Sequence, residues 1–377
     1  MNDNPFASAV ARPRIIVGLP HLSDGKLLAK AESREWPVMV SASSLAKWKT
    51  LHHRGQRARE WKSWNRGPLD RLIGRKIEIH LDSAGFVAMA LRGGYDWSPE
   101  SYIHGLASHP MIARFSAMDM CVEPEIAPDR GEVNERIART IALNHHCSRV
   151  AKDAGCESRL MPVIQGANAT DYLRCFEAIA NIIPEHNTIG VGSMCRRKTT
   201  SDDGSISIVE ALDKSLPKHI KLHLFGVKSD SYEAMAMFGE RVSSVDSQSY
   251  GTRARCIANE RRKTNPEFSK TDAFVAGVME DWYDKQSQRF ESPRVFSRQT
   301  GLDFSPLDTP TTVLEAAIAL ARQEIADLIE TGGMDHDAII GPRMLEEWTA
   351  EILHNLPPGM QPSDPWQGEW KMPDKAA

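Results

Sequence analysis

The segment from Ser243 to Arg253 places residue types that could do chemistry close together. A short apolar run ends in Asp246, and a stretch that we expect to be a loop follows, with Gly251, Arg253 and Arg255. A carboxylate at the C-terminal tip of a strand can be aimed into a pocket, and arginines beyond it can hold an anionic substrate. The alternative is that Asp246 only opens a turn, which is the commoner role of a lone aspartate.

Polar residues recur where other short apolar runs end. They are Asp82 after residues 77–81, Asp119 within 115–120, Gln165 after 160–164, the turn Gly190–Gly192 in 188–192, and Asp246 at the end of 242–246. Each has an ordinary structural explanation by itself. Their recurrence at successive strand ends favours one shared site.

The apolar runs alternate with segments of helical spacing. Further strands are expected at residues 14–19, 38–40 and 221–227, and helices at 98–109, 132–154, 169–183, 206–216 and 231–238. This alternation predicts an α/β fold with a parallel sheet. Polar residues at the carboxyl edge of that sheet predict a closed, TIM-like (β/α)8 barrel with its site on that face.

The chain has 377 residues, whereas a barrel of this kind takes roughly 250. We therefore expect a catalytic barrel in residues 1–265 and a helical C-terminal portion in 266–377, which packs on the barrel or completes it. Helices are expected in that portion at 272–290, 311–331 and 342–354.

Cations and tryptophans are interleaved between residues 45 and 76. Ten Lys and Arg residues stand there against Glu60 and Asp70, with Trp48, Trp61 and Trp64 among them. Clustered cations neutralise phosphates and indole rings stack on bases, which favours nucleic-acid contact. The candidate contacts are Lys47, Lys49, Arg57, Arg59 and Lys62. The alternative is a solvated amphipathic helix whose tryptophans face the core.

Bulk composition sets further limits. A formal net charge of −4 does not by itself predict a nucleic-acid partner. The six cysteines include no Cys-x-x-Cys pair, which argues against a zinc ribbon and a disulfide framework and suits a reducing cytoplasm. No apolar run is long enough to span a membrane, and the N-terminus lacks a signal-peptide core.

In their order along the chain, these motifs resemble the tRNA-guanine transglycosylase superfamily. Within it, the chain is similar to the DpdA-type 7-deazaguanine DNA transglycosylases of phages and bacteria. That family's Asp-Ser-Gly-Gly-Tyr/Phe motif is matched by Asp82 to Phe86 (DSAGF), and its Asp-x-Cys by Asp119 to Cys121. Its Val-Gln-Gly-Gly and Ile-Gly-Gly-Leu are matched by 164–167 (IQGA) and 189–192 (IGVG). Its Met-Gly-Val-Gly is matched by 225–228 (FGVK), and its nucleophile segment by Val245-Asp246 with Thr252-Arg253.

The resemblance, which covers roughly residues 75–255, implies an exchange of bases at an N-glycosidic bond. Asp246 is then the nucleophile that holds the sugar as a covalent ester at C1′, and Asp82 the general acid and base. The expected base pocket consists of Asp119 for the N1–H and 2-amino edge, Gln165 and an amide among Gly190, Val191 and Gly192 for O6, Phe86 and Phe225 for stacking, and Cys121. Arg253 and Arg255 join the nucleic-acid contacts.

Departures from the family pattern favour DNA over tRNA. The tRNA enzymes carry a Cys-x-Cys-x-x-Cys zinc site after the nucleophile, whereas only Cys256 follows Asp246 here. We therefore expect neither the zinc subdomain nor any other cofactor. The partners implied are DNA and a 7-deazaguanine base such as preQ0 (7-cyano-7-deazaguanine), with no membrane. Ala84 and Val87 stand where the family has Gly and Gln, which leaves the preference for the 7-substituent open.

Three functions follow as hypotheses. The first is a DNA guanine transglycosylase that inserts a 7-deazaguanine, and the second is the same chemistry on tRNA. The third is a non-catalytic nucleic-acid binder or an unrelated barrel enzyme, for instance a glycosidase that uses Asp82 and Asp246. Base exchange leaves the polymer intact, a glycosidase releases free sugar, and a binder tolerates the loss of Asp246.

Overall fold

The computed structural model describes residues 12–53, 56–124, 126–183, 188–195, 197–201, 203–291 and 312–330, with short stretches between 348 and 366. The chain divides into two compact units, residues 1–294 and 295–377. The boundary predicted from the sequence was residue 265.

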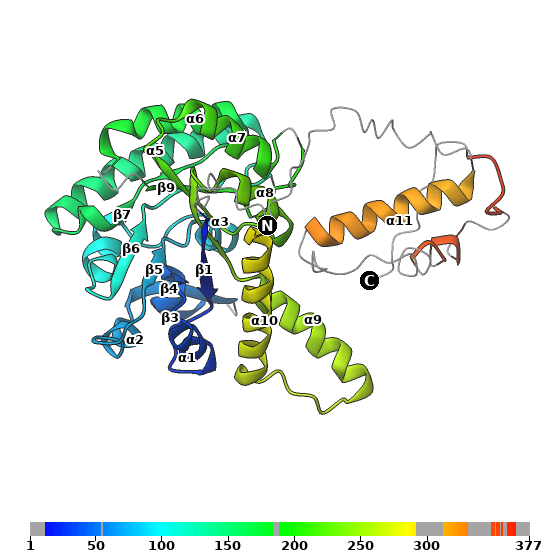
Figure 1. Cartoon of the computed structure of the whole chain (residues 1–377), viewed down its shortest axis with the longest axis horizontal. Helices are drawn as coiled ribbons and strands as arrows, with labels where there is room; N and C mark the ends of the chain where they lie inside the picture. The colour runs from blue at the N-terminus through cyan, green and yellow to red at the C-terminus, as the bar shows by residue number, and fades with distance from the viewer. Residues whose placement is uncertain are drawn as a thin grey trace, which may run out of the picture. The chain divides into compact units, whose positions relative to one another are not determined.

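The first unit is built around parallel strands whose order in the sheet follows their order in the chain (Figure 1). The strands are β1 (Arg14–Leu19), β2 (Val38–Ser41), β5 (Ile79–Asp82), β6 (Ile112–Ser116), β7 (Leu160–Met161), β8 (Val163–Ile164), β9 (Thr188–Val191), β10 (Lys221–Leu224) and β11 (Val242–Ser247). β1 pairs with both β2 and β11. The fold is therefore an α/β, TIM-like barrel, as the alternation of strands and helices predicted.

The ring closes through one strand that is split at Pro162. β7 pairs with β6 and β8 pairs with β9, and Pro162 lacks the N–H that a continuous strand would contribute. Beyond the end of β6, the side chain of Asn144 takes the place of a neighbouring strand. Its Oδ1 accepts the N–H of Val163 at 2.9 Å, and its Nδ2 donates to the Val163 carbonyl at 2.9 Å.

Helices follow the strands and bury their apolar sides against them. They are α1 (Lys26–Ser33), α2 (Gly67–Asp70), α3 (Gly85–Arg92), α4 (Pro99–Tyr102), α5 (Arg130–Asp153), α6 (Ala169–Ile179), α7 (Ser205–Ser215), α8 (Tyr232–Met235), α9 (Ser249–Thr264) and α10 (Asp272–Glu291). A π-helical segment, Ile103–Ala107, continues α4. Short 3-10 turns include η1 (Ala42–Leu45) after β2.

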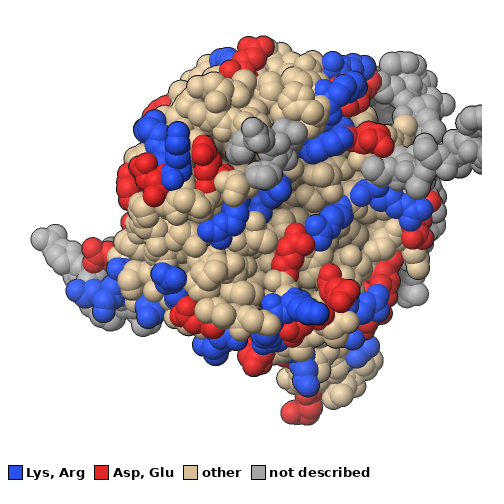
Figure 2. Space-filling model, turned by 60° about the vertical axis from the view of Figure 1, so that its left-hand side comes forward, with Lys and Arg blue, Asp and Glu red and all other residues tan. Residues whose placement is uncertain are grey.

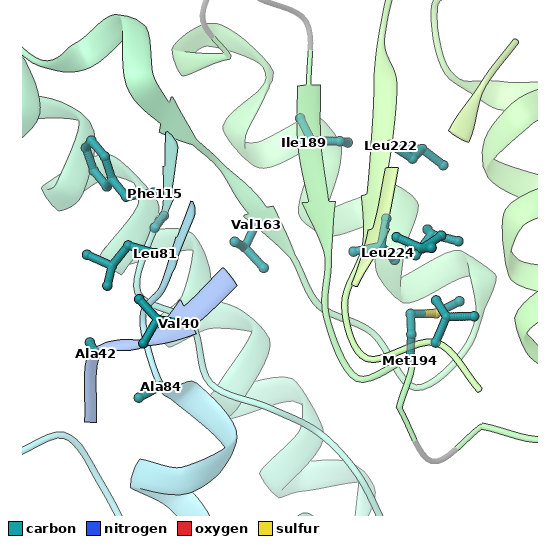
Figure 3. Packing of buried hydrophobic residues seen from close by; sticks show 14 of the residues in the cluster. Val40, Ala42, Leu81, Ala84, Phe115, Val163, Ile189, Met194, Leu222 and Leu224 are labelled. Carbon is teal, nitrogen blue, oxygen red and sulfur yellow. The ribbon is translucent and has the colours of Figure 1, made fainter. Parts of the chain in front are cut away.

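Alternate residues of the strands face opposite sides, which separates apolar from polar chemistry. Leu81, Leu222 and Leu224 belong to the buried apolar cluster, together with Phe115, Val163 and Ile189 of neighbouring strands (Figure 3). In the alternate positions, His80 of β5 precedes Leu81, and His223 of β10 lies between Leu222 and Leu224; both histidines are buried. The interior of the ring therefore carries polar side chains, and these lead up to the carboxyl ends of the strands.

Two expectations about local structure were wrong. The segment after Asp246 is not a loop, because α9 begins at Ser249 and buries Tyr250, Ala254 and Ala258 at helical spacing. β6 ends at Ser116, so Asp119 lies in the loop that follows the strand and not on it.

α10 completes the first unit. It packs against α9, α1, α8 and β1, and Figure 1 shows α9 and α10 side by side. Arg12 and Glu291 form an exposed ion pair at 3.1 Å, so the first described residue of this unit lies beside the last residue of α10. The contacts of α10 explain why the compact unit continues past residue 265.

The basic stretch folds as an antiparallel hairpin of β3 (Ala46–His53) and β4 (Gln56–Trp64), and not as a helix. Trp48, Trp61 and Trp64 lie on its inner side, packed against the core with Trp97. Trp64 Nε1 donates to the Ser101 carbonyl at 2.8 Å. The three half-buried indoles therefore anchor the hairpin to the barrel.

The second unit contains α11 (Val313–Glu330), within the helix expected at 311–331. Ala317 and Ala321 of α11 are buried with Ile352, and Thr312 bridges to Pro365. The helix expected at 342–354 lies partly outside the described residues. Its described parts, 348–350 and 352–354, are helical.

Candidate active site

A cavity of about 540 Å³ opens at the carboxyl ends of the barrel strands. Its volume lies within the roughly 300–1,000 Å³ typical of small-molecule sites. The lining includes Met39, Ser41, Asp82, Phe86, Asp119, Cys121, Glu123, Gln165, Gly192, Ser193, Cys195, Phe225, Gly226 and Asp246. Side chains from separate strand ends thus converge on one volume.

Asp82 is the last residue of β5, and its environment favours the protonated form. Burial raises its pKa from an ordinary value of 3.8 to about 7, and the nearby carboxylates Asp119 and Asp246 add to the shift. The Ala84 N–H, which donates to Asp82 Oδ2 at 3.1 Å, and the Ser41 hydroxyl act in the opposite direction. A carboxyl group with a pKa near neutrality can both give and take a proton.

Asp119 is held at the cavity wall by several donors. Ser83 Oγ donates to its Oδ1 at 3.1 Å and Gln165 Nε2 to its Oδ2 at 2.5 Å, while Tyr95 Oη accepts its backbone N–H at 3.2 Å. Burial raises the pKa of Asp119 to about 6, although the bonds from Gln165 and Ser83 lower it. These hydrogen bonds hold Asp119 in place although it lies in a loop and not on a strand.

Two glycines make this packing possible. A Cβ at Gly85 would lie 2.8 Å from Asp119 Oδ1, and a Cβ at Gly192 would lie 2.1 Å from Gln165 Nε2. The side-chain Oε1 of Gln165 is buried and has no hydrogen-bond partner among the described residues. Ala84, where the family has glycine, adopts a left-handed φ of 72°. The first motif therefore places a residue with a side chain in a backbone conformation that favours glycine.

Asp246 approaches the cavity from β11, next to His223. Its Oδ1 accepts the Gly226 N–H at 3.0 Å and lies 3.3 Å from His223 Nε2, without hydrogen-bond geometry. His223 is fixed by Ser244 Oγ at 2.9 Å from its Nδ1 and by an edge-on contact with the Phe225 ring. No described residue donates to Asp246 Oδ2, which leaves that oxygen available to a ligand.

Most of the sequence-predicted base-pocket residues meet in this cavity. Those that line it are Asp82, Phe86, Asp119, Cys121, Gln165, Gly192, Phe225 and Asp246. Gly190 and Val191 do not line it. A Cβ at Gly190 would meet the Phe225 ring at 2.5 Å, so this glycine makes room for Phe225, and the Val191 side chain is buried in the apolar cluster.

Four residues at or beside the cavity were not predicted from the sequence: Ser41, Glu123, Ser193 and His223. Ser41 pairs in register with Asp82 across β2 and β5, which an alignment of strand ends could have suggested. Glu123 and Ser193 are joined by a hydrogen bond over 70 positions of chain, and no local pattern signals such a contact.

The predicted nucleic-acid contacts whose side chains are described do not line the cavity. Lys47, Lys49 and Lys62 are exposed on the hairpin, which leaves the barrel directly after η1, whose Ser43 and Ser44 line the cavity. Arg57 and Arg59 lie on β4, but their side chains fall outside the described part of the structure. Arg255 is exposed and Arg253 half-buried on α9. In Figure 2, Lys and Arg alternate with Asp and Glu on the face in view.

Four carboxylates line the cavity. Within the described part of the chain, no group of three or more His, Cys, Asp or Glu side chains is arranged to bind a metal ion. What the arrangement can do is transfer protons through Asp82 and offer a nucleophilic oxygen at Asp246, beside a polar wall formed by Asp119 and Gln165.

A comparison with protein families matched residues 72–270 to the model of DpdA, described as DeoxyPurine in DNA protein A. The chain belongs to the DpdA family. The matched range includes β5 to β11 and every carboxylate of the cavity, so membership rests on the part of the barrel that carries the site. A comparison with curated proteins gave no match.

Membership of the DpdA family indicates a transglycosylase-type enzyme that acts in deazapurine modification of DNA. Such an enzyme is related to the tRNA-guanine transglycosylases. The barrel and the resemblance stated from the motifs agree with it. No helix in the described residues is both long and apolar enough to cross a membrane.

Proposed function

We propose that this DpdA-family protein exchanges guanine in DNA for a 7-deazaguanine base through a covalent intermediate on Asp246. The observation that carries the proposal is the pairing in one cavity of Asp82, whose pKa is raised to about 7, with Asp246, whose Oδ2 is unengaged among the described residues. An acid and a nucleophile with distinct environments suit a two-step displacement.

In the first step, Asp246 Oδ2 attacks C1′ of the deoxyribose and the bond from C1′ to N9 breaks. Asp82 gives its proton to a ring nitrogen of the departing guanine, which leaves as the neutral base. The Gly226 N–H holds Asp246 Oδ1 and so directs the other oxygen outward. The product of this step is a glycosyl ester on Asp246 and an ionised Asp82.

In the second step, Asp82 takes the N9 proton of the incoming base. N9 then attacks C1′, the ester bond breaks, and Asp246 returns as a carboxylate. Because Asp82 alternates between giving and taking a proton, a pKa near the working pH serves both steps. The incoming base suggested by the family resemblance is a 7-deazaguanine such as preQ0.

Recognition of the guanine ring is assigned to Asp119 and Gln165. Asp119 would accept from N1–H and the 2-amino group, which adenine does not present together. Gln165, the Gly192 backbone and the half-buried rings of Phe86 and Phe225 would complete the pocket. The target nucleotide has to leave the base stack to reach this cavity, as for other enzymes that act on a base.

The test is exchange of labelled guanine into DNA and into tRNA, with each polymer digested separately for nucleoside analysis by mass spectrometry. Asp246→Asn should abolish exchange and prevent trapping of a covalent protein–DNA adduct. Asp281→Asn, an exposed position on α10, is the matched control and should retain both. Label in tRNA alone would support the second hypothesis, free sugar a glycosidase, and full activity of Asp246→Asn would reject the nucleophile.

A further inference from the structure

Glu123 is a buried carboxylate in the cavity wall that the proposed exchange steps do not use. Glu123 is 4% exposed. It lines the cavity together with Cys121 and Gly192. Ser193 Oγ donates to its Oε2 at 3.0 Å, and Cys195 Sγ lies 3.6 Å from its Oε1. Both partners are neutral. Among the described residues, no Lys, Arg or His forms an ion pair with it.

A buried carboxylate without a cation is costly, because two or three neutral hydrogen bonds replace only part of its hydration. Proteins retain such groups where a ligand supplies the missing partner. Because Ser193 and Cys195 both donate to Glu123, its carboxylate is the hydrogen-bond acceptor. A ligand group that binds the same carboxylate therefore has to be a hydrogen-bond donor, and a positively charged donor binds it most strongly.

The surrounding backbone is arranged to hold Glu123 in place. Ser193 has a left-handed φ of 51°, unusual for a residue with a side chain. In that conformation its Oγ accepts the Val122 N–H at 2.9 Å while it donates to Glu123. The hydroxyl thus connects the loop after β6 to the end of β9, and the carboxylate is positioned before any ligand arrives.

The position of Glu123 indicates which edge of a bound base it would meet. Ser193 directly follows Gly192, which lies so close to the Gln165 amide that a Cβ at Gly192 would be 2.1 Å from Gln165 Nε2. If Asp119 reads the N1 and 2-amino edge and Gln165 reads O6, the next position around the ring is carbon 7. Glu123, fixed by the residue after Gly192, then lies on the side of the 7-substituent.

We propose that Glu123 is a specificity residue that selects a 7-deazaguanine whose 7-substituent is a hydrogen-bond donor with positive charge, such as an aminomethyl or amidine group. This inference rests on the proposed function and narrows it. The nitrile of preQ0 presents only a lone pair to the carboxylate, so that base is disfavoured here. Glu123 takes no part in breaking the glycosidic bond.

The experiment compares three bases with the full-length protein: guanine, 7-cyano-7-deazaguanine and 7-aminomethyl-7-deazaguanine. Exchange into DNA is measured as kcat/KM for each, and binding of each free base is measured by calorimetry. The variants are Glu123→Gln, which keeps the shape and removes the charge, Glu123→Asp, which keeps the charge, and Glu177→Gln on the exposed side of α6 as the matched control.

We expect the wild type and Glu177→Gln to prefer the aminomethyl base over the cyano base by about 10- to 100-fold, the discrimination that one hydrogen bond to a charged group provides. Glu123→Gln should reduce that preference to within about threefold, because it lowers the use of the aminomethyl base more than the use of the cyano base or of guanine. Glu123→Asp should retain part of the preference. Guanine exchange also reports that each variant is folded.

Equal use of the two 7-deazaguanines by the wild type, or a uniform loss with all three bases in Glu123→Gln, would overturn the role of Glu123. Failure of guanine exchange in the wild type would count against the proposed function instead, since guanine has no 7-substituent. In that case the binding titrations still decide: absence of a preference for the aminomethyl base, or a preference that survives in Glu123→Gln, overturns the inference.

Discussion

At the scale of single residues, Asp82 is where the requirements of chemistry and stability diverge. Burial beside Asp119 and Asp246 brings its pKa to about 7, which suits proton transfer near neutral pH. The same environment penalises the ionised form, so the folded protein binds the Asp82 proton more tightly than the unfolded chain does. The site therefore makes the stability of the protein depend on pH.

Replacement of Asp82 by asparagine should remove the part of that dependence that is due to Asp82. Because the folded pKa is raised, the contribution of Asp82 to stability is complete below pH about 4 and is lost as pH rises through about 7. We expect Asp82→Asn to have a free energy of unfolding roughly 1–3 kcal/mol above that of the wild type at pH 8, with little or no gain at pH 4. Urea unfolding at both pH values measures this, and a gain that is equal at both would contradict the assignment.

At the scale of elements, the barrel depends on one side chain at its split strand. Asn144 of α5 satisfies both the N–H and the carbonyl of Val163, two residues before Gln165. No strand is available to replace it, since β6 ends at Ser116. The amide thus connects the closure of the ring to the position of a base-pocket residue.

Asn144→Ala should leave two buried backbone groups without partners. We expect the variant to lose about 2–4 kcal/mol of unfolding free energy, measured by denaturant titration. Asn134→Ala on the exposed side of α5 is the matched control and should change stability by less than about 0.5 kcal/mol. If Asn144→Ala lowered the free energy of unfolding by less than about 1 kcal/mol, the barrel would not depend on Asn144 for closure at the split strand.

The exposed lysines of the hairpin give a prediction for DNA. Replacement of Lys47, Lys49 and Lys62 by glutamine should weaken binding to DNA of any sequence and lower the slope of log K against log salt by up to about 3, if each contacts one phosphate. Lys214 and Lys218, at the C-terminal end of α7 and beyond it, are the control pair. An unchanged slope in a salt titration by fluorescence anisotropy would exclude the hairpin as a phosphate contact.

The strand ends that carry the site residues could be predicted from the sequence, whereas the hairpin could not. Strand ends that carry Asp82, Gln165 and Asp246 were found because a short apolar run followed by a polar residue is a local pattern. The hairpin was not found, although Lys47 and Lys49 alternate with Ala46 and Trp48 at the period of a strand. The dense positive charge there favours nucleic-acid contact and obscures the alternation that is typical of a strand.

Helix α9 was missed because its buried face is small. Tyr250, Ala254 and Ala258 recur every four residues, but two alanines give a weak apolar signal beside a glycine and a run of basic residues. The predicted pocket was incomplete for another reason. Glu123 acquires its role from Ser193 and Cys195, which only the closed ring brings next to it.

At the scale of the whole molecule, residues 1–294 form a compact unit with its own core, and the described residues that line the cavity all belong to it. The ring was predictable as a class because alternating strands and helices admit few parallel architectures. Its boundary was not, since α10 is joined to the barrel by side-chain packing that the sequence alone does not reveal. The packing of α10 on β1 and α1 also brings residue 291 next to residue 12.

Because Arg12 and Glu291 touch, the barrel unit has neighbouring ends, and its strands already form a closed cycle. Such a ring has no intrinsic first strand. A short peptide from residue 291 to residue 12 would allow new termini at Lys218, an exposed residue in the loop between α7 and β10, on the face away from the cavity. Circular permutation would then reorder the gene while Asp82, Asp119, Glu123 and Asp246 kept the same neighbours, which makes the site a property of the closed ring and not of the order in which it is synthesised.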